Sequence, residues 1–150
     1  MKTLITALLF TTICFGQNYI HINVGSGLVP TTTDGTGFIW SVEGKHFKNN
    51  LGFGIGYQVI AIPSAPHKSL KTSFTYKISH KNDKVLLLPT IGLLGDISTK
   101  NIFYGGGVEI GFTLPYGMIT TMGYGAYFNN QFSTTAKRVE MATIGIMLKI

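Results

Sequence analysis

The chain alternates apolar residues with small or polar residues over stretches of about ten positions, and turn-forming residues separate the stretches. Such alternation has the two-residue period of a β-strand, in which successive side chains point to opposite faces. We expect eight strands, at residues 18–27, 37–47, 51–62, 69–80, 85–95, 102–113, 117–128 and 138–150. The pattern predicts an all-β fold, although it leaves open the facing of 85–95, where leucines fall on both faces.

The two faces of each predicted strand decide between a soluble barrel and a membrane barrel. In 37–47 one face is apolar (Phe38, Trp40, Val42) and the other polar (Ser41, Glu43, Lys45). In 51–62 the second face carries mainly glycine (Gly52, Gly54, Gly56, Gln58). Glycine makes a poor water-facing surface but suits the crowded interior of an eight-stranded barrel. We therefore expect apolar side chains to face lipid, so that arginine at Ile55 would be more destabilising than serine at Gly54.

Strand length and loop length favour the same architecture. Ten residues, at a rise of about 3.4 Å and a tilt near 40°, cover roughly 26 Å, close to the ~25 Å apolar band of a membrane barrel. Short turns at 48–50, 81–84 and 114–117 alternate with connections at 28–36, 63–68, 96–101 and 129–137 that are mostly longer. Short turns are typical of the periplasmic side, which would also hold both ends of the barrel. Outward aromatics would then form an outer girdle (Phe38, Trp40, Tyr104, Phe128) and an inner one (Phe53, Tyr76, Phe112).

Composition and the first residues point to export. Only 12% of the residues are charged, and no apolar run after residue 16 reaches the roughly 18 residues of a membrane helix. The segment "MKTLITALLFTTICFG" has one early lysine, an apolar middle and a small residue before Gln17, which predicts a signal peptide at 1–16 and a barrel domain at 17–150. A lipoprotein signal at Cys14 is disfavoured by the bulky Ile13. Cleavage would remove the one cysteine, and with it thiol chemistry and disulfides.

Two stretches have the pattern of a small membrane barrel: "GGGVEIGFTLPYG" as a strand–turn–strand unit, and the alternating last strand "MATIGIMLKI". On these stretches, and over residues 17–150, the chain resembles the small eight-stranded outer-membrane barrels of the OmpA/OmpX type and the related outer membrane protein β-barrel domain family. The resemblance implies an antiparallel up-and-down transmembrane barrel in a bacterial outer membrane, a monomer that contacts lipids including lipopolysaccharide and is inserted by the barrel-assembly machinery. Family members usually end in an aromatic residue, whereas Ile150 is last here. The hairpin "NIFYGGGVEIGFTLPYG" also loosely resembles outer-membrane components of conjugative transfer systems.

Motifs that would carry chemistry are weak. The glycine spacings are followed by no helical pattern, which disfavours nucleotide binding, and the four histidines are scattered, which disfavours a metal or other cofactor. Ser79 and His80 are adjacent, but neighbours in a strand face opposite ways and these lie at a predicted periplasmic turn. His67 is expected in an outer loop with no acid nearby in sequence. We predict no enzymatic activity, with a lipid A deacylase or acyltransferase and a soluble ligand-binding barrel as alternatives.

Charges on the predicted inward face form the one candidate network: Glu43, Lys45, Lys71, Lys77, Glu109, with Lys149 at the end of the chain. Isolated charges are costly in a narrow lumen, so the carboxylates should pair with lysines and plug the barrel, Glu109 with Lys71 or Lys77. The net charge of +6 is too dispersed to indicate nucleic acid. Basic residues in the loops could contact anionic head groups: Lys68, Lys100, Lys137 and Arg138. The sequence thus predicts a structural or surface-interaction protein of the envelope.

Overall fold

The computed structural model describes residues 16–28, 36–61, 66–80, 84–97, 100–129 and 138–150. The predicted signal peptide lies outside the described residues except for Gly16. Within the described ranges, no helix is long and apolar enough to cross a membrane.

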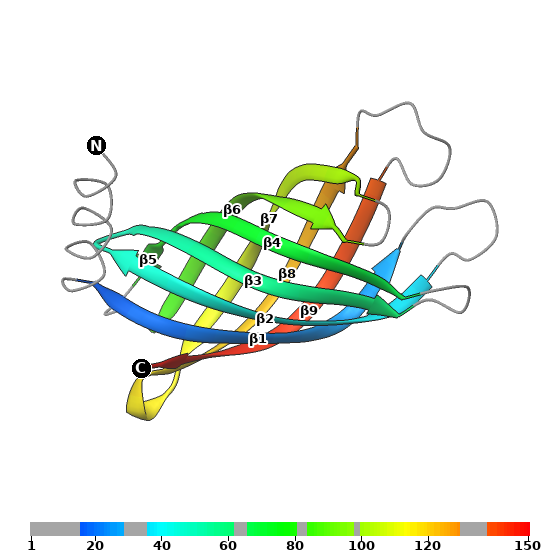
Figure 1. Ribbon diagram of the computed structural model, residues 1–150. Helices are drawn as coiled ribbons and strands as arrows, with labels where there is room; N and C mark the ends of the chain where they lie inside the picture. Colours follow the sequence, from blue (N-terminus) through cyan, green and yellow to red (C-terminus); the bar gives the residue numbers. More distant parts are fainter. Residues whose placement is uncertain (1–15, 29–35, 62–65, 81–83, 98–99, 130–137) are drawn as a thin grey trace, which may run out of the picture.

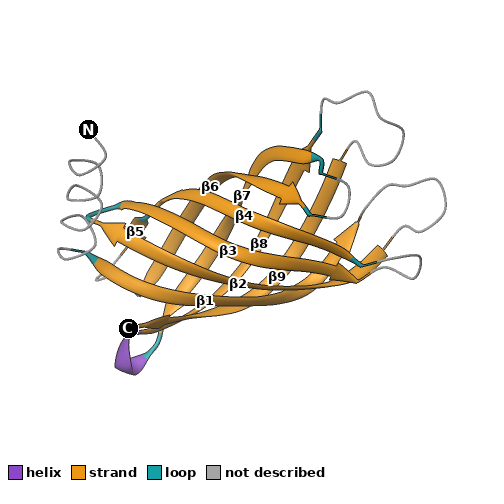
Figure 2. Cartoon of the chain, viewed as in Figure 1, coloured by secondary structure: helices purple, strands orange, loops and turns teal. Residues whose placement is uncertain are grey.

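One antiparallel sheet closes on itself (Figures 1 and 2). Its strands are β1 (Gln17–Leu28), β2 (Thr36–Lys48), β3 (Leu51–Ala61), β4 (His67–Tyr76), β5 (Ile78–His80), β6 (Val85–Asp96), β7 (Ile102–Thr113), β8 (Met118–Phe128) and β9 (Arg138–Lys149). β4 and β5 both pair with β6 and together form one wall of the barrel, and β1 pairs with β9 to close it. The predicted eight-stranded, antiparallel up-and-down barrel is confirmed, with strand bounds close to those expected.

The predicted strand 69–80 differs from the structure in one respect. It is interrupted at Lys77, whose backbone N–H donates to the carbonyl oxygen of Asn50 in the turn between β2 and β3, at 2.7 Å. The strand therefore divides into a long part that pairs with β3 and a three-residue part that pairs only with β6.

The outward face of the barrel is apolar, as the alternation predicts. Side chains of the predicted girdles are exposed at the outer end (Phe38, Trp40, Tyr104, Phe128) and at the inner end (Phe53, Tyr76, Phe112). Between these two levels the outward positions are mainly aliphatic, among them Ile22, Val42, Ile55, Val108, Met122 and Ile144. An exterior of this kind is suited to lipid and not to water, which argues against the soluble barrel.

The structure settles the facing of β6. Leu86, Leu88 and Leu94 are buried inside the barrel, whereas Leu87 and Ile91 are exposed on the outside. Leucines at both parities explain why the alternation is weak there.

The two ends of the barrel differ. Asn49–Asn50 and a 3₁₀ turn, η1 (Pro115–Gly117), lie at one end, here named the turn end, together with the C-terminus (Figure 1). Asn49 (φ 57°) and Gly117 (φ 74°) adopt the left-handed backbone that such tight turns require and that Asn and Gly tolerate best. The opposite end, where β1 finishes and β2 begins, is named the loop end.

The lumen is filled in three levels. An apolar cluster closes the loop end: Ile39, Ile60, Leu94, Phe103, Tyr127, Val139 and Met141. A second apolar cluster closes the turn end: Tyr19, Phe47, Leu86, Leu88, Ile119 and Met147. Buried polar side chains occupy the middle, including His21, Asn23, Ser41, Glu43, Lys45, Lys71, Ser73 and Thr121. This middle level, the polar layer, is the candidate site.

Candidate functional site

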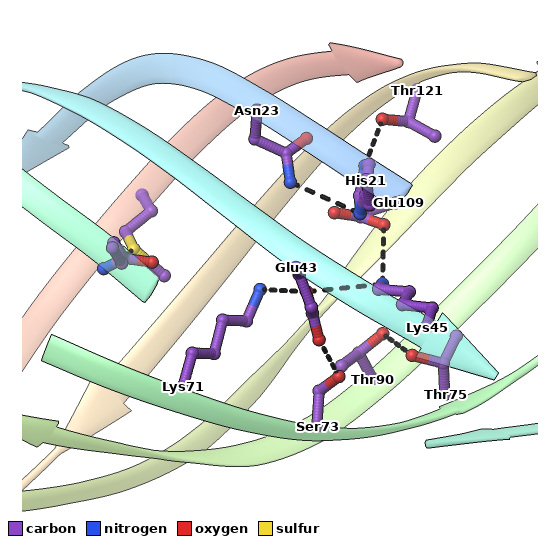
Figure 3. A network of polar contacts seen from close by, with 12 residues as sticks. His21, Asn23, Glu43, Lys45, Lys71, Ser73, Thr75, Thr90, Glu109 and Thr121 are labelled. Carbon is purple, nitrogen blue, oxygen red and sulfur yellow. Dashed lines mark hydrogen bonds and ion pairs between the residues drawn. The ribbon is translucent and has the colours of Figure 1, made fainter. Parts of the chain in front are cut away.

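The polar layer is built on the pairing of β2, β3 and β4. Glu43 of β2 lies opposite Gly56 of β3, which in turn lies opposite Lys71 of β4. All three positions point inward, and Gly56 has no side chain to stand between the other two. Lys71 therefore reaches across β3, and its Nζ lies 3.1 Å from Oε2 of Glu43 (Figure 3).

The next inward row supplies a second contact to the same carboxylate. Lys45, Gly54 and Ser73 are register partners across β2, β3 and β4. The hydroxyl of Ser73 donates a hydrogen bond to Oε1 of Glu43, above Gly54. Glu43 is fully buried, and hydrogen bonds and cations around a buried carboxylate offset part of its desolvation cost.

Lys45 stands between the two carboxylates of the layer. Its Nζ lies 3.8 Å from Oε2 of Glu43 and 3.7 Å from Oε2 of Glu109 on β7. The predicted pairing of Glu109 with Lys71 or Lys77 is wrong, because its partner is Lys45. Lys71 is already held by Glu43, and Lys77 lies at the strand break, half-exposed and outside the ion pairs of the described residues.

Hydrogen-bonded side chains of histidine, asparagine and threonine complete the polar layer. Nε2 of the fully buried His21 lies 3.0 Å from Oγ1 of Thr121, and Nδ1 of His21 lies 3.4 Å from Nδ2 of Asn23 (Figure 3). The hydroxyls of Thr75 and Thr90 are 2.9 Å apart. The sequence marks His21 only as an inward position of β1, and no motif identifies its partners.

A histidine–aspartate pair sits at the loop end. Nδ1 of His67 lies 2.9 Å from Oδ2 of Asp96, and Ser69 is the register partner of Asp96. The expectation that His67 lies in a loop is wrong, because it begins β4. No acid is near it in sequence, but Asp96 at the end of the neighbouring β6 is near it in space. The contact between His67 and Asp96 could have been predicted by pairing the loop-end residues of consecutive predicted strands.

A second polar group missed by the sequence analysis lies on the outer face. The Tyr124 hydroxyl donates to Oε2 of Glu140 at 2.5 Å, and Glu140 also forms an ion pair with Arg138. The Arg138 guanidinium carbon lies 5.5 Å from the centre of the Phe128 ring. Arg138 is the first residue of β9, as in the predicted strand 138–150, and lies at the loop end of the barrel.

Within the described part of the chain, no group of three or more histidine, aspartate or glutamate side chains is placed to hold a metal ion. The polar layer consists of ion pairs and hydrogen bonds between side chains, and it lies between two apolar clusters.

Gly54→Ala is expected to lower the free energy of unfolding by about 1–3 kcal/mol, because an added methyl group overpacks the site. It would meet the Glu43 carboxylate and the hydroxyl of Ser73, at 2.6 Å. A serine at Gly54 would meet the same two groups. Denaturant unfolding in lipid vesicles measures the effect, and Gly44→Ala is the matched control, since its methyl group would meet only the Ile55 carbonyl at 3.8 Å. Equal unfolding free energies for the two variants would contradict the role assigned to Gly54.

Comparison with known proteins shows the architecture. No protein-family model matches the chain, and no curated protein matches it. The crystal structure of Neisserial surface protein A (NspA) is similar at a TM-score of 0.67 and 14% identity, covering 89% of this chain and 97% of that one. The crystal structure of the outer membrane enzyme PagL is similar at a TM-score of 0.63 and 12% identity, covering 88% of this chain and 99% of that one. The chain therefore has the fold of small outer-membrane barrels, both a surface protein and an enzyme among them.

Proposed function

We propose that the protein is a closed, non-enzymatic barrel of a bacterial outer membrane that serves as a structural or surface-interaction component of the envelope. The observation that carries this proposal is the three-level filling of the lumen. A barrel blocked by two apolar clusters and an ion-paired middle offers no continuous aqueous path for a solute. What remains available for interaction is the loop end and the apolar exterior.

The proposed partners follow from that exterior. The apolar belt fits the hydrocarbon of the membrane, and Arg138, Lys68 and Lys100, all near the loop end, fit the anionic head groups of the outer leaflet, including lipopolysaccharide. We expect a monomer, inserted by the barrel-assembly machinery, with its loop end outside the cell. Pull-down from intact cells tests the alternative of a place in a conjugative transfer system.

Fractionation and conductance test the proposal. The full chain, expressed with its leader, should appear in the outer-membrane fraction and migrate faster on a gel without boiling, because a closed barrel resists detergent. The purified barrel in planar lipid bilayers should give no steady ion conductance, and an open porin reconstituted in the same way is the positive control. Steady conductance by the unmodified chain would overturn the proposed closed state.

One observation favours the enzymatic alternative. A histidine whose Nδ1 is bound by a carboxylate, as in the His67–Asp96 pair, can act as a general base through Nε2, and Ser69 lines the same small cavity. These residues face the lumen, whereas acyl chains lie on the outside of the barrel. We therefore expect no acyl chain to be released from purified lipid A, as measured by mass spectrometry. Release that is lost in both His67→Asn and Ser69→Ala would instead establish a deacylase.

A further inference from the structure

The polar layer holds a partly open cavity of about 40 Å³, whose lining also includes the outward-facing Val108 and Tyr124. Its polar lining comes from several strands of the barrel: Asn23, Ser41, Lys45, Gln58, Lys71 and Glu109. This volume exceeds the roughly 10–15 Å³ that a cavity needs to hold a water molecule.

The side chains around the cavity leave hydrogen-bonding capacity of both kinds. The Lys45 ammonium, with its side chain 1% exposed, lies 3.8 and 3.7 Å from its two carboxylates, and both distances exceed a hydrogen bond. Oε2 of Glu109 and Oδ1 of Asn23 are buried and accept no hydrogen bond from the described residues. The polar layer thus contains an ammonium that needs acceptors and two oxygens that need donors, and Figure 3 shows the residues that carry them.

The combination of one ammonium group and two unpaired oxygens restricts which kind of molecule can bind in the cavity. An anion would satisfy Lys45 but would be repelled by the carboxylate of Glu109, and a cation would meet the opposite problem. A small neutral molecule that both donates and accepts hydrogen bonds satisfies all three groups. Water is such a molecule, and buried polar groups left unpaired by the protein are commonly bridged by it.

We propose that the cavity is an internal binding site for water, which bridges Lys45 of β2 to Asn23 of β1 and Glu109 of β7. The waters complete a network that the side chains alone leave open. The apolar clusters above and below the cavity separate it from both sides of the membrane, so that these waters are part of the folded barrel and not of a conduction path.

Crystallography of the full barrel refolded in sodium bromide tests the occupant directly. Density for water within hydrogen-bond distance of Lys45 Nζ, Glu109 Oε2 and Asn23 Oδ1 is expected, without anomalous signal. An anomalous bromide peak in the cavity would establish an anion site instead. A direct hydrogen bond between Lys45 and Glu109 with no density beside it would also overturn the proposal.

A double-mutant cycle tests the bridge in solution. No hydrogen bond or ion pair among the described residues joins Lys45 to Asn23, so direct contacts predict additive effects of Lys45→Met and Asn23→Leu. Shared waters predict that the unfolding equilibrium constant of the double variant departs from additivity by roughly five-fold or more.

The control cycle combines Lys45→Met with Thr121→Val. Thr121 contacts His21, as Asn23 does, but it does not line the cavity. Coupling that runs through His21 would appear in this cycle as well, whereas coupling through shared waters would not. We therefore expect the effects of Lys45→Met and Thr121→Val to be additive. Additivity of the Lys45 and Asn23 changes, or equal coupling in both cycles, would overturn the water bridge.

Discussion

Lys71→Met is expected to lower the free energy of unfolding by about 3–5 kcal/mol, because it leaves the buried carboxylate of Glu43 without its nearest cation. The Nζ of Lys71 is 3.1 Å from that carboxylate, whereas the Nζ of Lys45 is 3.8 Å away. Urea unfolding of the barrel in lipid vesicles, followed by tryptophan fluorescence of Trp40, measures the change.

The double variant Glu43→Gln/Lys71→Met should recover much of that loss, because the unpaired buried charge is then gone. Lys77→Met is the matched control: Lys77 belongs to the same wall of the barrel but lies outside the network, so its removal should change stability little. Additive losses in the double variant, or a loss in the control as large as in Lys71→Met, would show that the Lys71–Glu43 pair does not hold the polar layer together.

Ile55→Arg is expected to destabilise the barrel by about 2–4 kcal/mol, because it places a cation on the lipid face near mid-depth. Ile55 is 58% exposed in the middle of β3, and its side chain points outward. Reversible folding into lipid vesicles, with denaturant titration, gives the free energy.

Leu51→Arg on the same face is the control for depth. Leu51 begins β3 at the turn end and is 67% exposed, so that an arginine there can reach the head groups. Its cost should fall to about 0–1 kcal/mol. Equal costs at the two positions would contradict the assignment of this face to a lipid bilayer.

The barrel itself was accessible from the sequence because a strand imposes a period of two. Glu43 and Lys45 could be assigned to the inside and Trp40 to the outside from parity alone, and the structure agrees. The exception, β6, carries leucine on both faces, since Leu86, Leu88 and Leu94 contribute to the apolar clusters of the lumen. Alternation of apolar with polar residues fails wherever the interior itself is apolar.

The contacts within the polar layer could not be predicted from the sequence in the same way. Parity gives the side of the sheet but not the distance between side chains, which depends on the register of three strands at once. Lys71 reaches Glu43 because Gly56 lies between them in the same row, and this leaves Lys45 for Glu109. His67 and Asp96 were missed for a related reason: they are distant in sequence and become neighbours only through the pairing of β4 with β6.

The seam between β1 and β9 also determines how the chain can fold. The other pairings join strands that are consecutive along the chain or, for β4 and β6, separated only by the three-residue β5, whereas Tyr19 pairs with Lys149 at the far end of the sequence. The free edge of β1 therefore stays open until the last strand has been delivered, and such long-range pairing is intrinsically slow. An open edge pairs readily with other chains, so the polypeptide must be kept from aggregating until β9 arrives. Closure of the seam is thus a late event in folding, and a chain that ends before β9 would remain an open sheet.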